Sequence, residues 1–174
     1  MKAVYVIRHG DWQIPNDRLT PSGLAGVAQK ADLFPEFAAV YTSPMVRTQQ
    51  TAEIIGRQKP QADERATRPY PPEACEEQIA KIRDTHPLGI AGALFSIPEA
   101  HSALQAAGQK LVQLIQEALD CLDDGQSALI VTHDGTMCAA EYVMRHKSFD
   151  TPLHHTYGTV EGYIVDQDMR IRKL

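Results

Sequence analysis

The stretch Ala3-Val4-Tyr5-Val6-Ile7-Arg8-His9-Gly10 decides the fold, because an apolar run ends abruptly in a cation, an imidazole and a glycine. A run of β-branched and aromatic residues predicts a buried strand. Open α/β sheets bind their ligands just beyond the carboxyl ends of such strands. We therefore expect Arg8 and His9 to lie at the ligand-binding edge of a sheet.

Bulk properties narrow the class of protein. With 174 residues, 43% of them hydrophobic, the chain is long enough for one domain with a full core. The formal net charge of -5 argues against a broad basic surface for nucleic acid. The three cysteines, Cys75, Cys121 and Cys138, match neither a disulfide framework nor a zinc site.

No apolar stretch reaches the roughly 20 residues that span a bilayer. Met1-Lys2 leads straight into a strand rather than into a secretory signal. We expect a cytoplasmic protein that binds neither nucleic acid nor a membrane, and the sequence leaves its oligomeric state open.

Hydrophobic periodicity and turn signals predict strands that alternate with helices. The expected strands are residues 2–8, 38–41, 128–131, 157–165 and 169–173. The expected helices are residues 21–34, 43–56, 73–83, 99–122 and 134–145. Residues 11–19 are expected to form a polar loop. This order favours an α/β three-layer sandwich, with a largely parallel central sheet flanked by helices.

Two helix starts carry the same local signal. Thr20-Pro21 and Ser43-Pro44 each combine a capping hydroxyl with a proline at the first helical position.

Prolines interrupt the pattern between residues 59 and 98, where only 73–83 is predicted to be helical. A long segment of weak periodicity inside a compact domain is more often a lid than an inert loop. We expect residues 1–174 to form one domain, with a flap at about 59–98 that sets the substrate. Trp12 and Tyr70 are interpreted as half-buried loop aromatics, with a place in the substrate pocket as the alternative.

Polar groups follow three of the expected strands. Arg8 and His9 follow the first, Arg47 lies in the first turn of the helix after the second, and His133 follows the third. The carboxyl ends of parallel strands converge on one crevice. Guanidinium groups pair bidentately with phosphoryl oxygens, and one imidazole can attack phosphorus while the other cations stabilise the transition state. The sequence therefore predicts a phosphoryl-transfer site.

Arg47 by itself is ambiguous. A cation in the first turn opposes the helix dipole, and an anion bound at the helix N-terminus would account for it. Taken alone, the position favours extension into solvent.

Three motifs follow one another along nearly the whole chain: Arg8-His9-Gly10, Ser43-Pro44-x-x-Arg47-x-x-Gln50-Thr51-Ala52 and Thr132-His133-x-Gly135. They resemble the histidine phosphatase superfamily, also called the phosphoglycerate mutase-like family. The resemblance implies a phosphoglycerate mutase-like fold, no metal and no other cofactor. It also implies a covalent phosphohistidine on His9.

The resemblance further implies roles for other residues of this chain. Arg8, Arg47 and His133 would form the phosphate pocket around His9. Asn16 and Ser22 lie near the place where the family's first loop reaches the phosphate.

The chain departs from the family pattern at the general acid, the group that protonates the leaving oxygen. At the position where the mutase-like branch has a glutamate, the resemblance places Arg68. In the acid phosphatase branch the acid is the aspartate directly after the second histidine, which here is Asp134. Asp134 could equally be the N-cap of the following helix. Glu73 on the flap is the next candidate acid.

The sequence thus predicts a metal-independent phosphohydrolase that acts on a phosphorylated small molecule or phosphoprotein. Two alternatives stay open: a phosphoglycerate mutase-like phosphoryl transferase, and a protein that binds a phosphorylated ligand with little catalysis. The sequence does not identify the physiological substrate.

Overall fold

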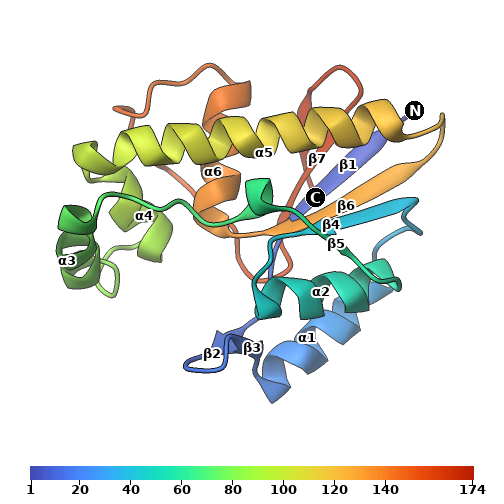
Figure 1. Ribbon diagram of the computed structural model, residues 1–174, viewed down its shortest axis with the longest axis horizontal. Helices are drawn as coiled ribbons and strands as arrows, with labels where there is room; N and C mark the ends of the chain where they lie inside the picture. The colour runs from blue at the N-terminus through green and yellow to red at the C-terminus, as the bar shows by residue number, and fades with distance from the viewer.

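The computed structural model describes residues 1–174 and has a six-stranded sheet between two layers of helices (Figure 1). In spatial order the strands are β5 (Gln61–Ala62), β4 (Ala39–Thr42), β6 (Ser127–Thr132), β1 (Ala3–Arg8), β7 (Gly162–Asp166) and β8 (Ile171–Lys173). The first four strands pair in parallel, whereas β7 runs antiparallel to β1 and β8 antiparallel to β7. The predicted α/β sandwich with a largely parallel sheet is confirmed.

Helices cover both faces of the sheet (Figure 1). One face carries α1 (Pro21–Ala31) and α2 (Val46–Gly56), and the other carries α5 (His101–Cys121) and α6 (Asp134–Met144). Helices α3 (Glu73–Ile82) and α4 (Gly89–Phe95) lie beyond the carboxyl ends of the central strands, with short 3-10 turns at Glu64–Ala66 and Pro98–Ala100. None of these helices combines the length and the apolar composition that crossing a membrane requires.

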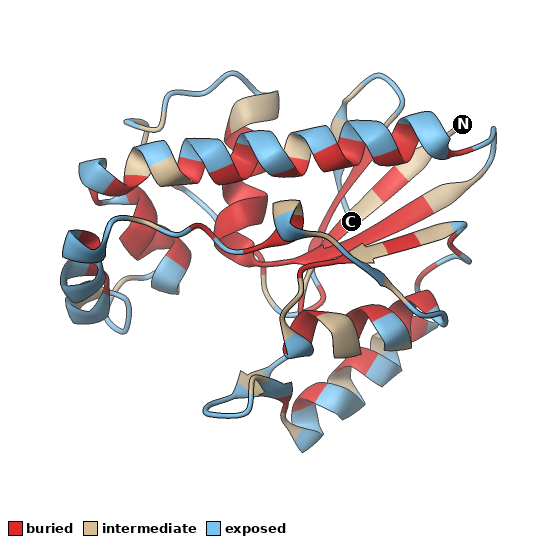
Figure 2. Cartoon of the chain, in the orientation of Figure 1, coloured by how far each residue is buried: buried red, intermediate tan, exposed pale blue.

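The sheet is the buried centre of the molecule (Figure 2). Successive side chains of a strand point to opposite faces, so Ala128 and Ile130 pack under α5 and α6 while Leu129 and Val131 pack under α1 and α2. A strand buried on both faces needs apolar residues at every position, which explains its continuous apolar run.

Residues 11–19 are not a simple loop, so that prediction was wrong. They form a hairpin of β2 (Trp12–Gln13) and β3 (Arg18–Leu19), in which Trp12 pairs with Leu19. Leu19 is 4% exposed, and its backbone N–H donates to Gln50 Oε1 of α2 at 2.9 Å. Strands of two residues are too short to show a period in the sequence, and contacts with α2 stabilise them.

The two predicted helix starts differ. Thr20 caps α1 as predicted, because its hydroxyl accepts from the Gly23 N–H at 2.9 Å. Helix α2 starts later than predicted, with Met45 at the N-cap instead of Ser43. The Ser43 hydroxyl lies 3.1 Å from a ring nitrogen of His133, so a tertiary contact overrides the local capping signal.

The structure also contains one helix that the sequence does not predict, and one strand that starts later than predicted. Helix α4 was missed because two of its seven residues are glycines, which lower helix propensity, but its residues 91–95 are buried against the core. Strand β7 begins at Gly162 rather than at residue 157. Val160 has a φ of 58°, in the left-handed region, so the chain before Gly162 cannot continue an extended strand.

Candidate active site

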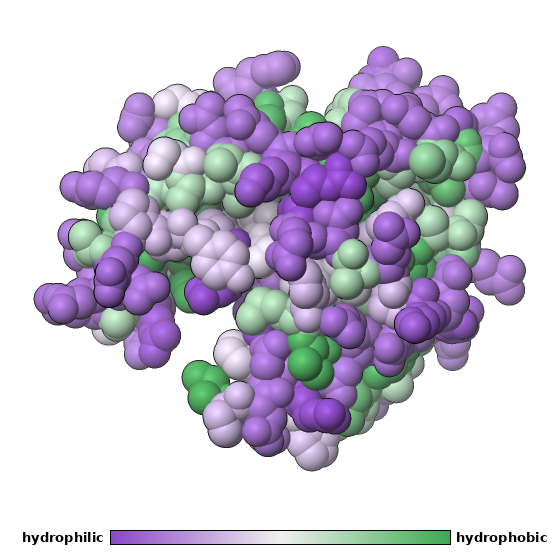
Figure 3. All heavy atoms as spheres, viewed as in Figure 1, coloured by the Kyte–Doolittle hydropathy of each residue, from purple (hydrophilic) through white to green (hydrophobic).

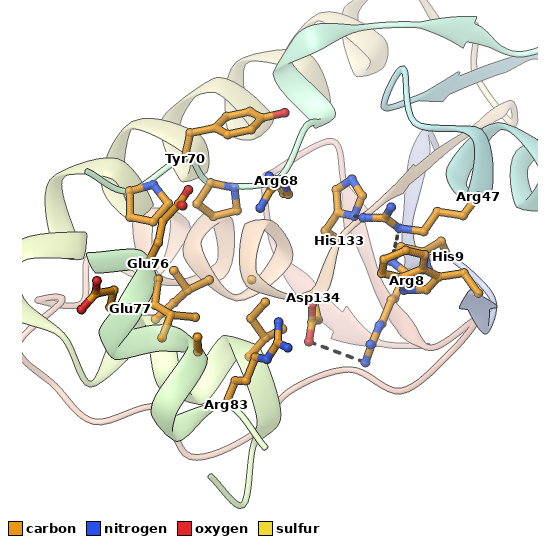
Figure 4. Close-up of a pocket in the computed structure, with 18 residues that line it drawn as sticks. Arg8, His9, Arg47, Arg68, Tyr70, Glu76, Glu77, Arg83, His133 and Asp134 are labelled. Carbon is orange, nitrogen blue, oxygen red and sulfur yellow. Dashed lines mark hydrogen bonds and ion pairs between the residues drawn. The ribbon is translucent and has the colours of Figure 1, made fainter. Parts of the chain in front are cut away.

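The predicted convergence at the strand ends is present. Arg8 ends β1, His9 follows it, Arg47 lies in the first turn of α2, and His133 lies between β6 and α6. All four residues line one cavity of about 590 Å³ (Figure 4). Figure 3 shows the surface hollowed between the part that carries α3 and the β2–β3 hairpin, both of which contribute residues to this cavity.

His9 is held as a neutral imidazole. Its Nδ1 lies 2.8 Å from the Gly10 carbonyl oxygen, which can only accept, so Nδ1 carries the proton and Nε2 carries the lone pair. Arg47 Nε donates to that lone pair at 3.1 Å. Burial, aided by the charges of Arg47 and Arg8 and opposed by the Gly10 hydrogen bond, lowers the pKa of His9 to about 3. His9 therefore presents an unprotonated nitrogen within the cavity.

A glycine must follow His9. A Cβ at Gly10 would lie 2.5 Å from Val27 Cγ2 and 3.1 Å from Leu19 Cδ2, so a side chain would displace α1 or β3. The Gly10 N–H donates to Thr51 Oγ1 at 3.0 Å, which joins this turn to α2. The close approach keeps His9 in register with Arg47.

His133 is the second neutral imidazole. Arg47 Nη2 lies 3.3 Å from His133 Nδ1, and because a guanidinium only donates, Nδ1 accepts. The remaining nitrogen, Nε2, then donates to Ser43 Oγ at 3.1 Å. Burial, together with the charges of His9 and Arg47, lowers the pKa of His133 well below its usual value. The ring centres of His9 and His133 lie 5.2 Å apart.

Arg47 is the hub of the site. It is 5% exposed, contacts both histidines, and lies with its guanidinium carbon 4.2 Å from the centre of the Trp12 ring. Burial lowers the pKa of Arg47, and the paired carboxylate of Asp17 opposes that shift. The interpretation that Arg47 extends into solvent was therefore wrong. Trp12 of the β2–β3 hairpin lines the cavity.

Asp17 is a residue that sequence reasoning missed. Its carboxylate pairs with Arg47 Nη1, and its Oδ2 accepts from the Val46 N–H at 2.9 Å, so it caps α2 from another segment. Its neighbour Asn16, the residue expected near the phosphate, is exposed and does not line the cavity. Only the turn of the hairpin decides which of these two side chains faces α2, and no local sequence signal separates them.

Ser22 is also placed away from the phosphate pocket. It is exposed in the first turn of α1, where its hydroxyl lies 2.9 Å from that of Thr20. It lines a separate small pocket with Gly10 and Asp11. The structure does not bring Ser22 to the four central residues.

Arg8 and Asp134 form the floor of the cavity on the α6 side (Figure 4). Arg8 Nη1 donates to the Tyr157 carbonyl at 2.8 Å and lies 3.5 Å from Asp134 Oδ2. Arg8 Nε is buried and has no hydrogen-bond acceptor in the protein. Asp134 accepts from the Thr156 hydroxyl at 3.3 Å.

Asp134 is not the N-cap of α6, so that alternative was wrong. His133 occupies the N-cap position without a side-chain cap, and Asp134 is the first helical residue. There it lies at the positive end of the helix dipole, and its carboxyl group faces Arg8 within the cavity.

The outer part of the cavity is built by the flap. Glu73 is exposed at the start of α3 and does not line the cavity. Glu76, Ile79, Ala80 and Arg83 do, because helical spacing puts them on one face of α3. Arg68 lies over the Tyr70 ring at 4.8 Å and has no carboxylate within 4.0 Å.

Tyr70 is 64% exposed and lines this cavity, so the interpretation as a half-buried loop aromatic was wrong. In Figure 4, Arg68 stands between the histidine pair and the far end, where Tyr70, Glu76 and Glu77 gather.

Comparison with known proteins agrees with this geometry. The sequence profile of the histidine phosphatase superfamily (branch 1) matches residues 4–167. None of the functionally curated proteins that were compared has a matching sequence.

Three solved structures illustrate the likeness in fold. The mycobacterial glucosyl-3-phosphoglycerate phosphatase, in a complex with VO3, superposes with a TM-score of 0.75 at 15% identity, covering 100% of this chain and 98% of that one. Phosphoserine phosphatase from Entamoeba histolytica gives a TM-score of 0.65 at 16% identity, covering 99% and 95%. A putative alpha-ribazole-5'-P phosphatase from Escherichia coli gives 0.66 at 20% identity, again covering 99% and 95%. At such identities the likeness establishes the fold alone.

Proposed function

The chain belongs to branch 1 of the histidine phosphatase superfamily, and we propose that it is a metal-independent phosphohydrolase that forms a phosphohistidine on His9. The observation that carries the proposal is the state of His9: a buried, neutral imidazole with its lone pair on Nε2, surrounded by guanidinium groups. A nucleophile needs the lone pair, and a phosphoryl dianion needs the cations.

In the first step, Arg47 Nε exchanges its hydrogen bond to His9 Nε2 for one to a phosphoryl oxygen, and the freed Nε2 lone pair attacks phosphorus in line with the leaving oxygen. The N–P bond forms as the P–O bond breaks, and the ring gains positive charge, which Nδ1–H shares with the Gly10 carbonyl. The Arg8 and Arg47 guanidinium groups donate to the phosphoryl oxygens, and His133 joins them when its Nε2–H turns from Ser43 Oγ to the phosphoryl group. Because His9 lies at the buried end of the cavity, the leaving group departs toward the flap.

In this proposal Asp134 is the general acid that supplies the proton to the leaving oxygen. Its carboxyl group lies within the cavity at the start of α6, whereas Glu73 lies outside. In the second step, the Asp134 carboxylate accepts a proton from water as the water oxygen attacks phosphorus. The N–P bond then breaks, inorganic phosphate leaves, and His9 is again neutral.

A phosphorylated small molecule is the substrate class that we favour. The named neighbours above are phosphatases of phosphorylated small molecules. In this chain the flap closes one side of a cavity of about 590 Å³ with both cationic and anionic side chains, a volume in the range of small-molecule sites.

The decisive experiment traps the intermediate. The enzyme is mixed with a ³²P-labelled aryl phosphate and quenched in alkaline denaturant, because acid hydrolyses the N–P bond of phosphohistidine. We expect label on the wild type at His9 and none on His9→Ala. Turnover by the wild type without label on His9 would overturn the mechanism.

Assays of phosphoglycerate isomerisation, ester hydrolysis and phosphate binding separate the mutase and binding-protein alternatives from the phosphohydrolase. Isomerisation of phosphoglycerate that exceeds ester hydrolysis would indicate a mutase. Tight phosphate binding without hydrolysis of an activated aryl phosphate would indicate a binding protein.

A further inference from the structure

A short segment behind the active site holds two of its residues. We call His155-Thr156-Tyr157 the strap; it belongs to no helix or strand. Its Tyr157 carbonyl accepts from Arg8 Nη1 at 2.8 Å, and its Thr156 hydroxyl donates to Asp134 at 3.3 Å. The strap therefore contacts one residue that we assign to phosphoryl binding and one that we assign to proton transfer.

A buried carboxylate fastens the strap from the other side. Glu141 of α6 is 5% exposed, and its Oε2 accepts from the Tyr157 hydroxyl at 2.7 Å and from His155 Nε2 at 3.0 Å. Its Oε1 accepts from Arg145 Nε at 2.8 Å. Burial opposes ionisation, but the Tyr157 hydrogen bond and the neighbouring His155 and Arg145 side chains outweigh it and hold the pKa of Glu141 below its usual value.

Such a carboxylate is costly to bury unless its hydrogen bonds are worth more than its hydration. Glu141 does not line the active-site cavity and so cannot act on substrate directly. Its contacts all lead to the strap or to the surface residue Arg145, so its effect on the reaction must pass through the strap.

Core packing holds the strap on one side, where Tyr157 is 7% exposed. Its outer side borders a second cavity of about 770 Å³, which Glu141, Arg145 and all three strap residues line. The strap has no ladder of backbone hydrogen bonds. The hydrogen bonds to Glu141 therefore add to the core packing of the Tyr157 ring in fixing its position.

We infer that Glu141 and Tyr157 are positioning residues that hold the Arg8 guanidinium in its phosphate-binding orientation. With Nη1 held by the Tyr157 carbonyl, the Arg8 guanidinium is fixed at the wall of the active-site cavity. The inference rests on the proposed function only in assigning the phosphoryl group to Arg8.

The test compares two buried tyrosine hydroxyls of the same core. Tyr157→Phe removes the bond to Glu141, whereas Tyr163→Phe removes a bond to the Met137 carbonyl and leaves the strap untouched. The rings of these tyrosines lie 5.5 Å apart, so the two variants perturb similar surroundings. Affinity for inorganic phosphate, measured by calorimetry, is the readout, since it needs no turnover.

We expect Tyr157→Phe to weaken phosphate binding about tenfold, the worth of one buried hydrogen bond, and Tyr163→Phe to weaken it less than twofold. Glu141→Gln should also weaken phosphate binding. In an Arg8→Ala background, Tyr157→Phe should cause no further loss, because the residue through which it acts is gone.

Equal effects of the two tyrosine variants, or a full additional loss in the Arg8→Ala background, would overturn the inference. If Tyr157→Phe weakens phosphate binding only when Arg8 is present, but no phosphohistidine forms, the proposed function is overturned and the positioning role stands. Thermal melting of each variant shows whether it is folded at the assay temperature, and Glu141→Gln carries the test if Tyr157→Phe is not.

Discussion

The two halves of the active-site cavity are built in different ways. In the inner half, His9, Arg47 and His133 are each at most 5% exposed and are joined by hydrogen bonds of 3.1 and 3.3 Å. In the outer half, Arg68, Tyr70, Glu76, Glu77 and Arg83 are all exposed, and no hydrogen bond joins one of them to another.

The difference follows from the elements that carry each half. Parallel strand ends and the first turns of α2 and α6 lie in the core, where each side chain is held by its neighbours. The flap carries its residues on a short helix and an irregular segment at the surface, where side chains can be exchanged at little cost in stability. We infer that the inner half performs the chemistry and that the outer half selects the leaving group.

The largest expected effect is at the hub of the inner half. Arg47→Gln removes the charge and the donors to both histidines, so kcat/KM should fall about 1,000-fold for every phosphorylated substrate. Steady-state kinetics on an alkyl and an aryl phosphate measure it, with the exposed Arg172→Gln as the matched control. A loss confined to one substrate would contradict the division between the halves.

Asp134 lies where the halves meet and tests the assignment of the acid. Asp134→Asn keeps the shape but cannot give a proton, so hydrolysis of an alkyl phosphate should fall about 100-fold. An activated aryl phosphate, whose leaving group departs without a proton, should lose only a few-fold. Asp124→Asn on an exposed turn is the control, and equal losses on both substrates would indicate a purely structural aspartate.

Burial of His9 should also make stability depend on pH. Its folded-state pKa of about 3 lies below the ordinary value of 6.5, so the unfolded chain binds more protons between these values and stability falls as pH falls. Between pH 8 and pH 5, His9 alone should cost about 2 kcal/mol of the free energy of unfolding.

Urea denaturation at the two pH values measures this cost. His9→Gln should lose correspondingly less stability on acidification than the wild type, while the exposed His154→Gln should behave like the wild type. A His9→Gln curve parallel to that of the wild type would show that His9 is not held neutral.

The smallest expected effect is in the outer half. Arg68→Gln should raise KM about fivefold for substrates with an anionic leaving group and leave kcat nearly unchanged, since an exposed charge is worth about 1 kcal/mol. Comparing substrates with charged and neutral leaving groups measures it. A fall in kcat of similar size for all substrates would show that Arg68 takes part in the chemistry and would contradict the division between the two halves.

The sequence predicted the inner half better than the outer one. Arg8, His9, Arg47 and His133 were placed together because each follows an apolar strand, and such runs are visible in neighbouring residues. Asn16 and Ser22 were expected near the phosphate and are exposed elsewhere. Their positions depend on how the hairpin and α1 turn, for which the sequence holds no comparable signal.

Carboxylates show the limit most clearly. The sequence offered Asp134 and Glu73 as acids; Asp134 lines the cavity, while Glu73 gives way to Glu76 and Glu77 on the inward face of α3. No local sequence pattern points to Asp17, although it pairs with Arg47.

By itself the sequence determined the sheet, its helical layers and the four groups at the strand ends, because hydrophobic period and the polar residues that end it are local properties. Only the tertiary structure decided which nitrogen of each histidine carries the proton, which carboxylate pairs with Arg47 and what holds Arg8. These depend on contacts between residues far apart in the chain, 30 positions for Arg47 and Asp17 and 149 for Arg8 and Tyr157. No pattern in neighbouring residues encodes such a contact, because it forms only when packing of the core brings the segments together.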